Sequence, residues 1–166
     1  MSEVIPLAQP VQKVPEFSGD LLPIRTDGVS VLFTTEEETL AAARVAAVLA
    51  RAMAVPMTIV HCRAVPYPLS VDAPVGVSPA ESDAFIRRLQ SEGVDARVRV
   101  FLCRDRENVA PKAFRRHSLI VVGGRRRWWP TASERWRRRL EAAGHFVLFT
   151  DVREAAGSVT LKASCA

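Results

Sequence analysis

The chain has 166 residues, of which 48% are hydrophobic, and a formal net charge of +5 at neutral pH. This length and apolar content predict one ordinary domain with its own hydrophobic core. The charge is compatible with acidic partners, but it is too small to indicate a nucleic-acid-binding protein by itself. An odd number of cysteines without a CxxC pair excludes a disulfide framework and predicts reduced thiols, as in a cytosolic protein. The cysteines are Cys62, Cys103 and Cys165.

Neither a metal site nor a membrane span is expected. No pair of histidines has the spacing of zinc ligands. The histidines are His61, His117 and His145. The N-terminus has neither the basic region nor the long apolar run of a signal peptide. The most apolar window, residues 40–60, contains Arg44, Arg51 and Pro56, which indicates an amphipathic helix followed by a strand. The sequence therefore predicts a soluble, cytoplasmic protein.

Strand and helix patterns alternate after a proline-rich beginning. Residues 1–27 carry four of the eleven prolines and no sustained periodicity, so they are expected to form an extended or disordered arm. Apolar runs predict strands at residues 29–35, 55–62, 94–103, 118–124 and 145–151. Helical patterns lie between them at residues 35–53, 78–93, 107–117 and 131–143. Residues 152–166 are expected to be a C-terminal tail, in which 158–162 are a candidate extra strand.

Local signals refine these elements. Thr35 and Thr131 each precede a glutamate by three residues, which is the spacing of a capping box at a helix start. Arg97 and Arg99 alternate with valines, so that strand is expected at an edge of the sheet. Pro111 is expected to disturb the third helical segment, because it lacks a backbone N–H group.

Five strands separated by helices predict an α/β fold with a five-stranded, parallel, doubly wound sheet. Ligands bind such sheets at the carboxyl ends of the strands, near the point where the strand order reverses. The candidate positions in this chain are Thr34–Thr35, His61–Cys62 and Gly123–Arg127.

Three segments, "VSVLFTTEEETLAAARVAAVLARAMAVPMTIVHCRA", "SLIVVGGRRR" and "HFVLFTD", carry a resemblance to a known family. In the order and spacing of its elements, the domain at residues 28–151 resembles the universal stress protein family, whose fold is of the adenine nucleotide alpha hydrolase-like type. The resemblance implies dimerisation through the last strand and a role in stress response. It also implies membership of either an ATP-binding or a non-binding group. The binders carry an aspartate after strand one and the motif G-x2-G-x9-G-[S/T] after strand four.

The chain departs from the binder motif. Thr34 and Thr35 stand at the aspartate position and carry no charge. Gly123 fits the first motif glycine, but Arg126 falls at the second, where a side chain blocks close approach of a backbone to phosphate. The phosphate cradle is therefore degenerate. If ATP or AMP did bind, the residues expected to hold it are Thr34, Thr35, Gly123, Gly124, Arg125 and Ser133.

Arginines and tryptophans gather in the loop after the fourth strand. A solvated helix face explains the arginines farther along the chain, but it does not explain two tryptophans beside Pro130. Tryptophan and arginine are enriched at protein interfaces. The loop is therefore predicted to bind a partner with an acidic surface through Arg125, Arg126, Arg127, Trp128 and Trp129.

The sequence favours a non-enzymatic, universal stress protein-like binding or assembly module, such as an accessory subunit of a larger complex. No catalytic constellation is recognisable, and no cofactor or metal is expected. The alternative is an ATP- or AMP-binding regulator with at most slow ATP hydrolysis. The expected partner is a protein or a second copy of the chain joined through the last strand. A third possibility is binding of nucleic acid or an anionic membrane surface through the arginine loop. Nucleic acid is disfavoured, since the fold class offers no standard element that reads a groove. Peripheral association with a membrane complex stays open.

Overall fold

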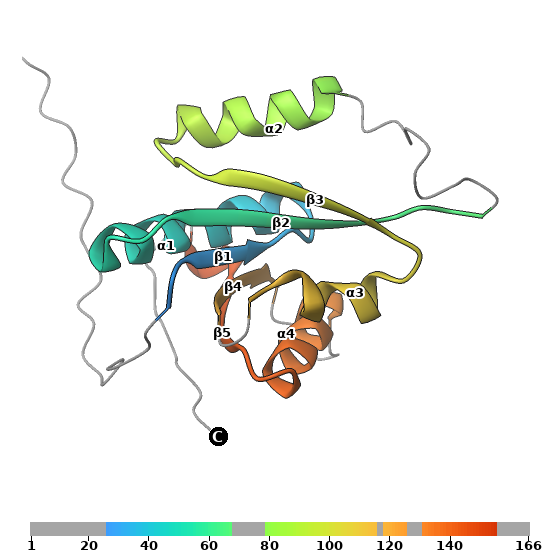
Figure 1. Cartoon of the computed structure of the whole chain (residues 1–166). Helices are drawn as coiled ribbons and strands as arrows, with labels where there is room; N and C mark the ends of the chain where they lie inside the picture. The colour runs from blue at the N-terminus through green and yellow to red at the C-terminus, as the bar shows by residue number, and fades with distance from the viewer. Residues whose placement is uncertain (1–25, 68–78, 116–117, 126–130, 156–166) are drawn as a thin grey trace, which may run out of the picture.

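The computed structural model describes residues 26–67, 79–115, 118–125 and 131–155. Figure 1 shows a twisted sheet between helices. The strands are β1 (Val29–Leu32), β2 (Met57–Ala64), β3 (Arg97–Cys103), β4 (Leu119–Gly124) and β5 (Phe146–Asp151). The helices are α1 (Glu36–Met53), α2 (Pro79–Ser91), α3 (Arg106–Ala113), α4 (Ala132–Ala142) and α5 (Val152–Ala155).

All five strands are parallel, and their order in the sheet is β3-β2-β1-β4-β5. The central strand β1 pairs with β2 on one side and β4 on the other, so that Val31 lies beside both Ile59 and Val121. The chain progresses outward from β1 to β3, then returns to the other side for β4 and β5. This order confirms the predicted doubly wound sheet and places the reversal between β1 and β4.

The core has two layers, one on each face of the sheet. One face packs valines and leucines of the strands against α1 and α2, with Leu40 and Leu89 as buried contacts. The other face packs Val60 and Ile120 against α3 and α4, where Leu140 is fully buried. All six residues of β4 are buried, as its uninterrupted apolar run predicts. Each fully buried aliphatic side chain contributes roughly 1.5–3 kcal/mol to folding.

Threonine caps start α1 and α4 as the sequence predicts. The Thr35 hydroxyl accepts the Glu38 N–H at 3.3 Å, and the Thr131 hydroxyl accepts the Glu134 N–H at 3.3 Å. The Glu38 carboxylate accepts a hydrogen bond from the Ser133 hydroxyl at 3.3 Å. The hydrogen bond from the Glu38 N–H to the Thr35 side chain is therefore present, as the predicted capping box requires. The Glu38 side chain is bonded to Ser133 of α4.

Several boundaries differ from the sequence prediction. β1 ends at Leu32, which leaves Thr34 and Thr35 in the turn before α1. Helix α3 ends at Ala113 instead of residue 117, because Pro111 removes one helix hydrogen bond and Phe114 is extended. The short helix α5 continues beyond residue 151, where the domain was predicted to end.

His145 is buried, with only 7% of its surface exposed, and its Nε2 lies 3.0 Å from the Pro111 carbonyl oxygen. Within the described ranges, no helix is long and apolar enough to cross a membrane. Several predicted features lie outside the described residues, namely residues 1–25 of the N-terminal arm, His117, residues 126–130, the candidate strand at 158–162 and Cys165.

Candidate functional site: the crevice between β1 and β4

The carboxyl ends of β1 and β4 form the crevice in which this fold class binds ligands. The N-termini of α1 and α4 both approach it, since Ser133 in the first turn of α4 contacts Glu38 in the first turn of α1. Helix N-termini present unpaired N–H groups and a partial positive charge, which is the usual device for binding phosphate. The geometry of a phosphate site is therefore present in outline.

The two glycines at the end of β4 are required by packing. A Cβ atom on Gly123 would lie 1.9 Å from the backbone carbonyl oxygen of Glu38. A Cβ atom on Gly124 would lie 2.7 Å from both the Ser133 Cβ and the Phe149 ring. Such separations are far below van der Waals contact, so glycine at both positions lets α1 and α4 pack directly on the strand. This requirement explains the pair of glycines without reference to a nucleotide.

Three glutamates occupy the first turn of α1, next to the crevice. Glu37 pairs with Arg125 at 2.7 Å, and Glu36 pairs with Arg88 at 2.7 Å. Glu38 bonds Ser133, which is only 3% exposed. Carboxylates favour the positive end of a helix dipole, so the chain supplies its own anions where a bound phosphate would lie. Arg125, which was expected to neutralise phosphate, is paired with the Glu37 carboxylate at the surface of the same domain.

Thr34 and Thr35 take different roles at the end of β1. Thr35 caps α1, as described above, and its carbonyl oxygen accepts the Thr39 hydroxyl at 2.6 Å. The Thr34 N–H donates to the Thr39 hydroxyl oxygen at 3.2 Å. The Thr34 hydroxyl is buried and has no hydrogen-bond partner among the described residues. A neutral hydroxyl therefore stands where the nucleotide-binding proteins of the resembled family carry a carboxylate.

Beside the crevice, His61 stacks on Phe33, with ring centroids 4.2 Å apart. Because β2 continues to Ala64, His61 and Cys62 lie within the strand and not at its end, where the sequence places them. Burial lowers the pKa of His61, and the positive charges of Arg106 and Arg63 lower it further. Arg106 donates a hydrogen bond to the Phe33 carbonyl oxygen at 3.5 Å. Arg106 was not among the residues predicted for this site. Its position directly after Asp105, which caps α3, was the available signal.

The cysteines on β2 and β3 are free and buried. Burial, together with the neighbouring Cys103, raises the pKa of Cys62 to about 11. A thiol with such a pKa is almost entirely protonated at neutral pH, so Cys62 is a core residue and a poor nucleophile. In the part of the chain that the structure describes, no three His, Cys, Asp or Glu side chains gather as a metal site.

The structure thus brings most of the predicted nucleotide residues to one crevice. Their interactions are with one another, with the first turn of α1 and with Phe149. In the predicted partner loop, Arg125 is placed in an ion pair with Glu37. The rest of that loop lies outside the described residues, namely Arg126, Arg127, Trp128 and Trp129.

Comparisons with known proteins support the fold. No protein-family model matches the chain. No curated protein matches it either. Among solved structures, the chain is similar to a universal stress protein from Archaeoglobus fulgidus, with a TM-score of 0.50 and 16% sequence identity. The similarity covers 74% of this chain and 91% of that protein. The fold is therefore universal stress protein-like, and at this identity the likeness concerns the fold alone.

Proposed function

We propose that this chain is a non-enzymatic binding or assembly module that keeps the universal stress protein-like fold without its nucleotide. The observation that carries the proposal is the ion pair of Glu37 with Arg125, together with the Glu38–Ser133 hydrogen bond, in the β1–β4 crevice. An incoming triphosphate would meet these carboxylates and would have to displace Arg125 from one of them. Because His61 stacks on Phe33 and no carboxylate orients its ring among the described contacts, we also propose that the crevice performs no acid–base catalysis.

The nucleotide part of the proposal is tested by thermal unfolding with millimolar ATP or AMP and magnesium. A ligand at hundredfold excess over its Kd stabilises the folded state by about 2.7 kcal/mol. For a chain of this length, that gain raises Tm by roughly 5–10 °C. We expect no saturable shift with either nucleotide. A saturable shift that is lost in Gly123→Ser would contradict the proposal.

The second candidate function is an ATP- or AMP-binding regulator. Two observations favour it: the N-termini of α1 and α4 face the same crevice, and the buried Thr34 hydroxyl has no partner in the described structure. This candidate predicts that Glu37→Gln and Glu38→Gln together strengthen nucleotide binding, since they remove two negative charges. If neither the double variant nor the wild type binds ATP, this candidate function is contradicted.

Association through the last strand belongs to the same proposal. β5 lies at an edge of the sheet, and Phe146 on it is 47% exposed. An apolar edge strand is prone to pair with another chain unless it is covered. We expect sedimentation at micromolar concentration to give a dimer that Phe146→Lys dissociates. The matched control is Val100→Lys on the opposite edge strand β3, where Val100 is 42% exposed. Equal effects of the two lysines would contradict a β5 interface.

A partner protein is also proposed for the arm at residues 1–27 and the loop that begins at Arg125. Replacing Trp128 and Trp129 with alanine is expected to cost the complex about 2 kcal/mol or more, because loop tryptophans act as hot spots. Deleting residues 2–22 is expected to reduce co-purification with the partner and to leave the Tm of the domain nearly unchanged. Unchanged association in both variants would remove these segments from the interface.

A further inference from the structure

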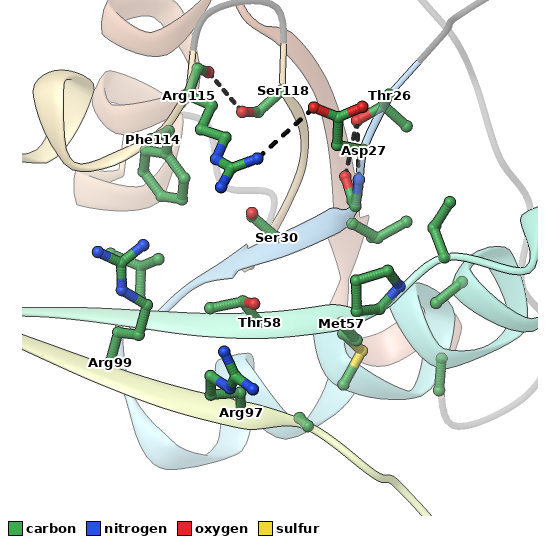
Figure 2. A pocket seen from close by; sticks show the side chains of 18 of the residues that line it. Thr26, Asp27, Ser30, Met57, Thr58, Arg97, Arg99, Phe114, Arg115 and Ser118 are labelled. Carbon is green, nitrogen blue, oxygen red and sulfur yellow. Dashed lines mark hydrogen bonds and ion pairs between the residues drawn. The ribbon is translucent and has the colours of Figure 1, made fainter.

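Among the residues that the structure describes, the short α3 leaves half of one sheet face open. Eight residues of α helix extend about 12 Å, whereas the eight residues of β2 extend about 26 Å. Ala110 of α3 packs over the carboxyl half of that face, where Cys62 and Cys103 are buried. A groove of about 1110 Å³ includes the amino half of this face and continues around the amino ends of the strands to α1, which contributes Ala50 and Arg51 to its lining; Figure 2 shows it from close by. This groove lies at the end of the strands opposite to the β1–β4 crevice.

Polar side chains form the floor of the groove. Ser30 on β1 lies beside Thr58 on β2, and Thr58 lies beside Arg97 on β3, so the three share one face in register. Two residues farther along β3, Arg99 lies on the same face. Interior strands under a helix carry apolar residues at such positions. Hydroxyls and a guanidinium in a row instead suit a surface that contacts water or a polar ligand.

The groove is positively charged. Arg97 and Arg99 form no ion pair with any residue that the structure describes. The Arg99 guanidinium lies over the Phe101 ring, 4.9 Å from its centroid, which holds it in place without neutralising it. On the opposite wall, Arg115 contacts Asp27 at 3.5 Å, but both side chains are more than four-fifths exposed. Such an exposed pair contributes little and is easily exchanged for another carboxylate.

The net charge of all the side chains that line the groove is also positive. The four arginines that line it outnumber its two aspartates. They are Arg51, Arg97, Arg99 and Arg115, and the aspartates are Asp27 and Asp95. Of these arginines, Arg51 already donates to the Gly93 carbonyl oxygen. The groove is therefore complementary to a negatively charged ligand.

The size and shape of the groove favour a peptide over a metabolite. Pockets for small ligands have volumes of roughly 300–1,000 Å³ and enclose most of the ligand surface. This groove is larger, and the arginines that line it on β3 are exposed. Arg97 and Arg99 are two residues apart on one strand, so their side chains leave the backbone about 6.6 Å apart. Alternate residues of an extended peptide have the same separation.

We propose that this groove binds an extended, acidic segment of a partner protein, in which acidic residues alternate with others. This proposal rests on the assembly function proposed above, and it names the groove as the surface that binds the partner. Carboxylates two residues apart accept charge-assisted hydrogen bonds from Arg97 and Arg99. Ser30 and Thr58 hydroxyls bond the peptide backbone, and Phe114 on the opposite wall contacts its apolar atoms.

The test uses the full chain and two fluorescein-labelled peptides of the same composition. In the first, glutamate alternates with threonine, and in the second, pairs of glutamates alternate with pairs of threonines. The second peptide has no two glutamates separated by a single residue. We expect fluorescence anisotropy to give tighter binding of the alternating peptide. Arg97→Gln with Arg99→Gln is expected to weaken that binding about tenfold or more. The matched control removes two exposed arginines elsewhere, Arg87 on α2 and Arg135 on α4, and is expected to change it less than twofold.

A second measurement does not depend on the variants. In nuclear magnetic resonance spectra of the wild-type chain, the alternating peptide is expected to shift the amide signals of Thr58 and Arg97. Equal binding of both peptides, equal weakening by both pairs of substitutions, or shifts confined to other surfaces would overturn the proposal. A shift in the signals of residues 1–25 caused by the Arg97 and Arg99 substitutions alone would assign the groove to the chain's own arm and also overturn it. Stabilisation by ATP would instead contradict the proposed function and leave the peptide result intact.

Discussion

Replacing Gly123 with alanine tests whether the glycine pair of β4 serves packing or a nucleotide. The new Cβ atom would lie 1.9, 2.7 and 3.2 Å from three backbone atoms of Glu38. A backbone cannot rotate away as a side chain can, so the first turn of α1 has to move outward. Overpacking of a core costs about 1–3 kcal/mol, and a contact with backbone belongs at the upper limit. We therefore expect a loss of about 3 kcal/mol, which lowers Tm by roughly 6–12 °C for a chain of this length.

Urea unfolding and scanning calorimetry measure this effect, with two other glycines as comparisons. In Gly124→Ala the new Cβ atom contacts the Phe149 ring and the Ser133 Cβ. Because the ring has some freedom to move, the loss in free energy of unfolding is expected to be smaller. Gly144→Ala meets no atom within 4 Å, but its φ of +84° is strained for alanine and costs about 1–2 kcal/mol. If Gly123→Ala melts within about 2 °C of the wild type, α1 is not seated on this glycine and the packing argument is wrong.

Three further outcomes follow from individual side chains. Thr35→Ala is expected to lower the free energy of unfolding by about 1 kcal/mol in urea, because α1 loses its cap, and Thr35→Ser is expected to retain it. The lowered pKa of His61 means that its contribution to stability is complete above the unfolded pKa of about 6.5 and is lost as pH falls below it. His61→Phe, which keeps a ring on Phe33, is therefore expected to lose less stability than the wild type between pH 7 and pH 5; an equal loss would contradict the burial argument. Cys62 is expected to resist alkylation at pH 8 until the protein unfolds. Rapid alkylation of Cys62 itself in the folded protein would show that its thiol is accessible.

The sequence was sufficient for the sheet but not for the interactions at its ends. The strands and helices follow from periodicity and caps, which are local properties, and the run at Leu119–Gly124 reads as a buried strand without any tertiary information. The partners of the glutamates could not be predicted, since Glu37 and Arg125 are 88 residues apart in the chain. The close approach of α1 to Gly123 is equally invisible in the sequence. It depends on how one helix lies over a strand that forms much later in the chain.

The sequence contains a signal for the groove in the side chains of three strands. Arg97 and Arg99 predict an edge strand, and the edge position of β3 is confirmed. Ser30 and Thr58 interrupt otherwise apolar strands, and the parallel register brings them into line with Arg97. Polar residues at matching positions of neighbouring strands indicate a face that contacts water, and none of the described helices covers this one. Pro111 in the third helical segment pointed to the same conclusion, because it shortened the helix that would have covered them.

The two ends of this sheet carry charges opposite to those a phosphate-binding protein of the same fold requires. At the carboxyl ends, glutamates of α1 stand at the positive end of the helix dipole, and glycines close the space between helix and strand. At the amino ends, arginines without ion-pair partners in the described structure line an open groove. A negatively charged ligand in the groove meets arginines that have no ion-pair partner in the described structure, whereas an anion in the crevice meets the glutamates of α1 and competes with Glu37 for Arg125. Binding by this domain is therefore expected to occur on the amino half of the open sheet face, and the crevice at the carboxyl ends contributes to holding the helices in place.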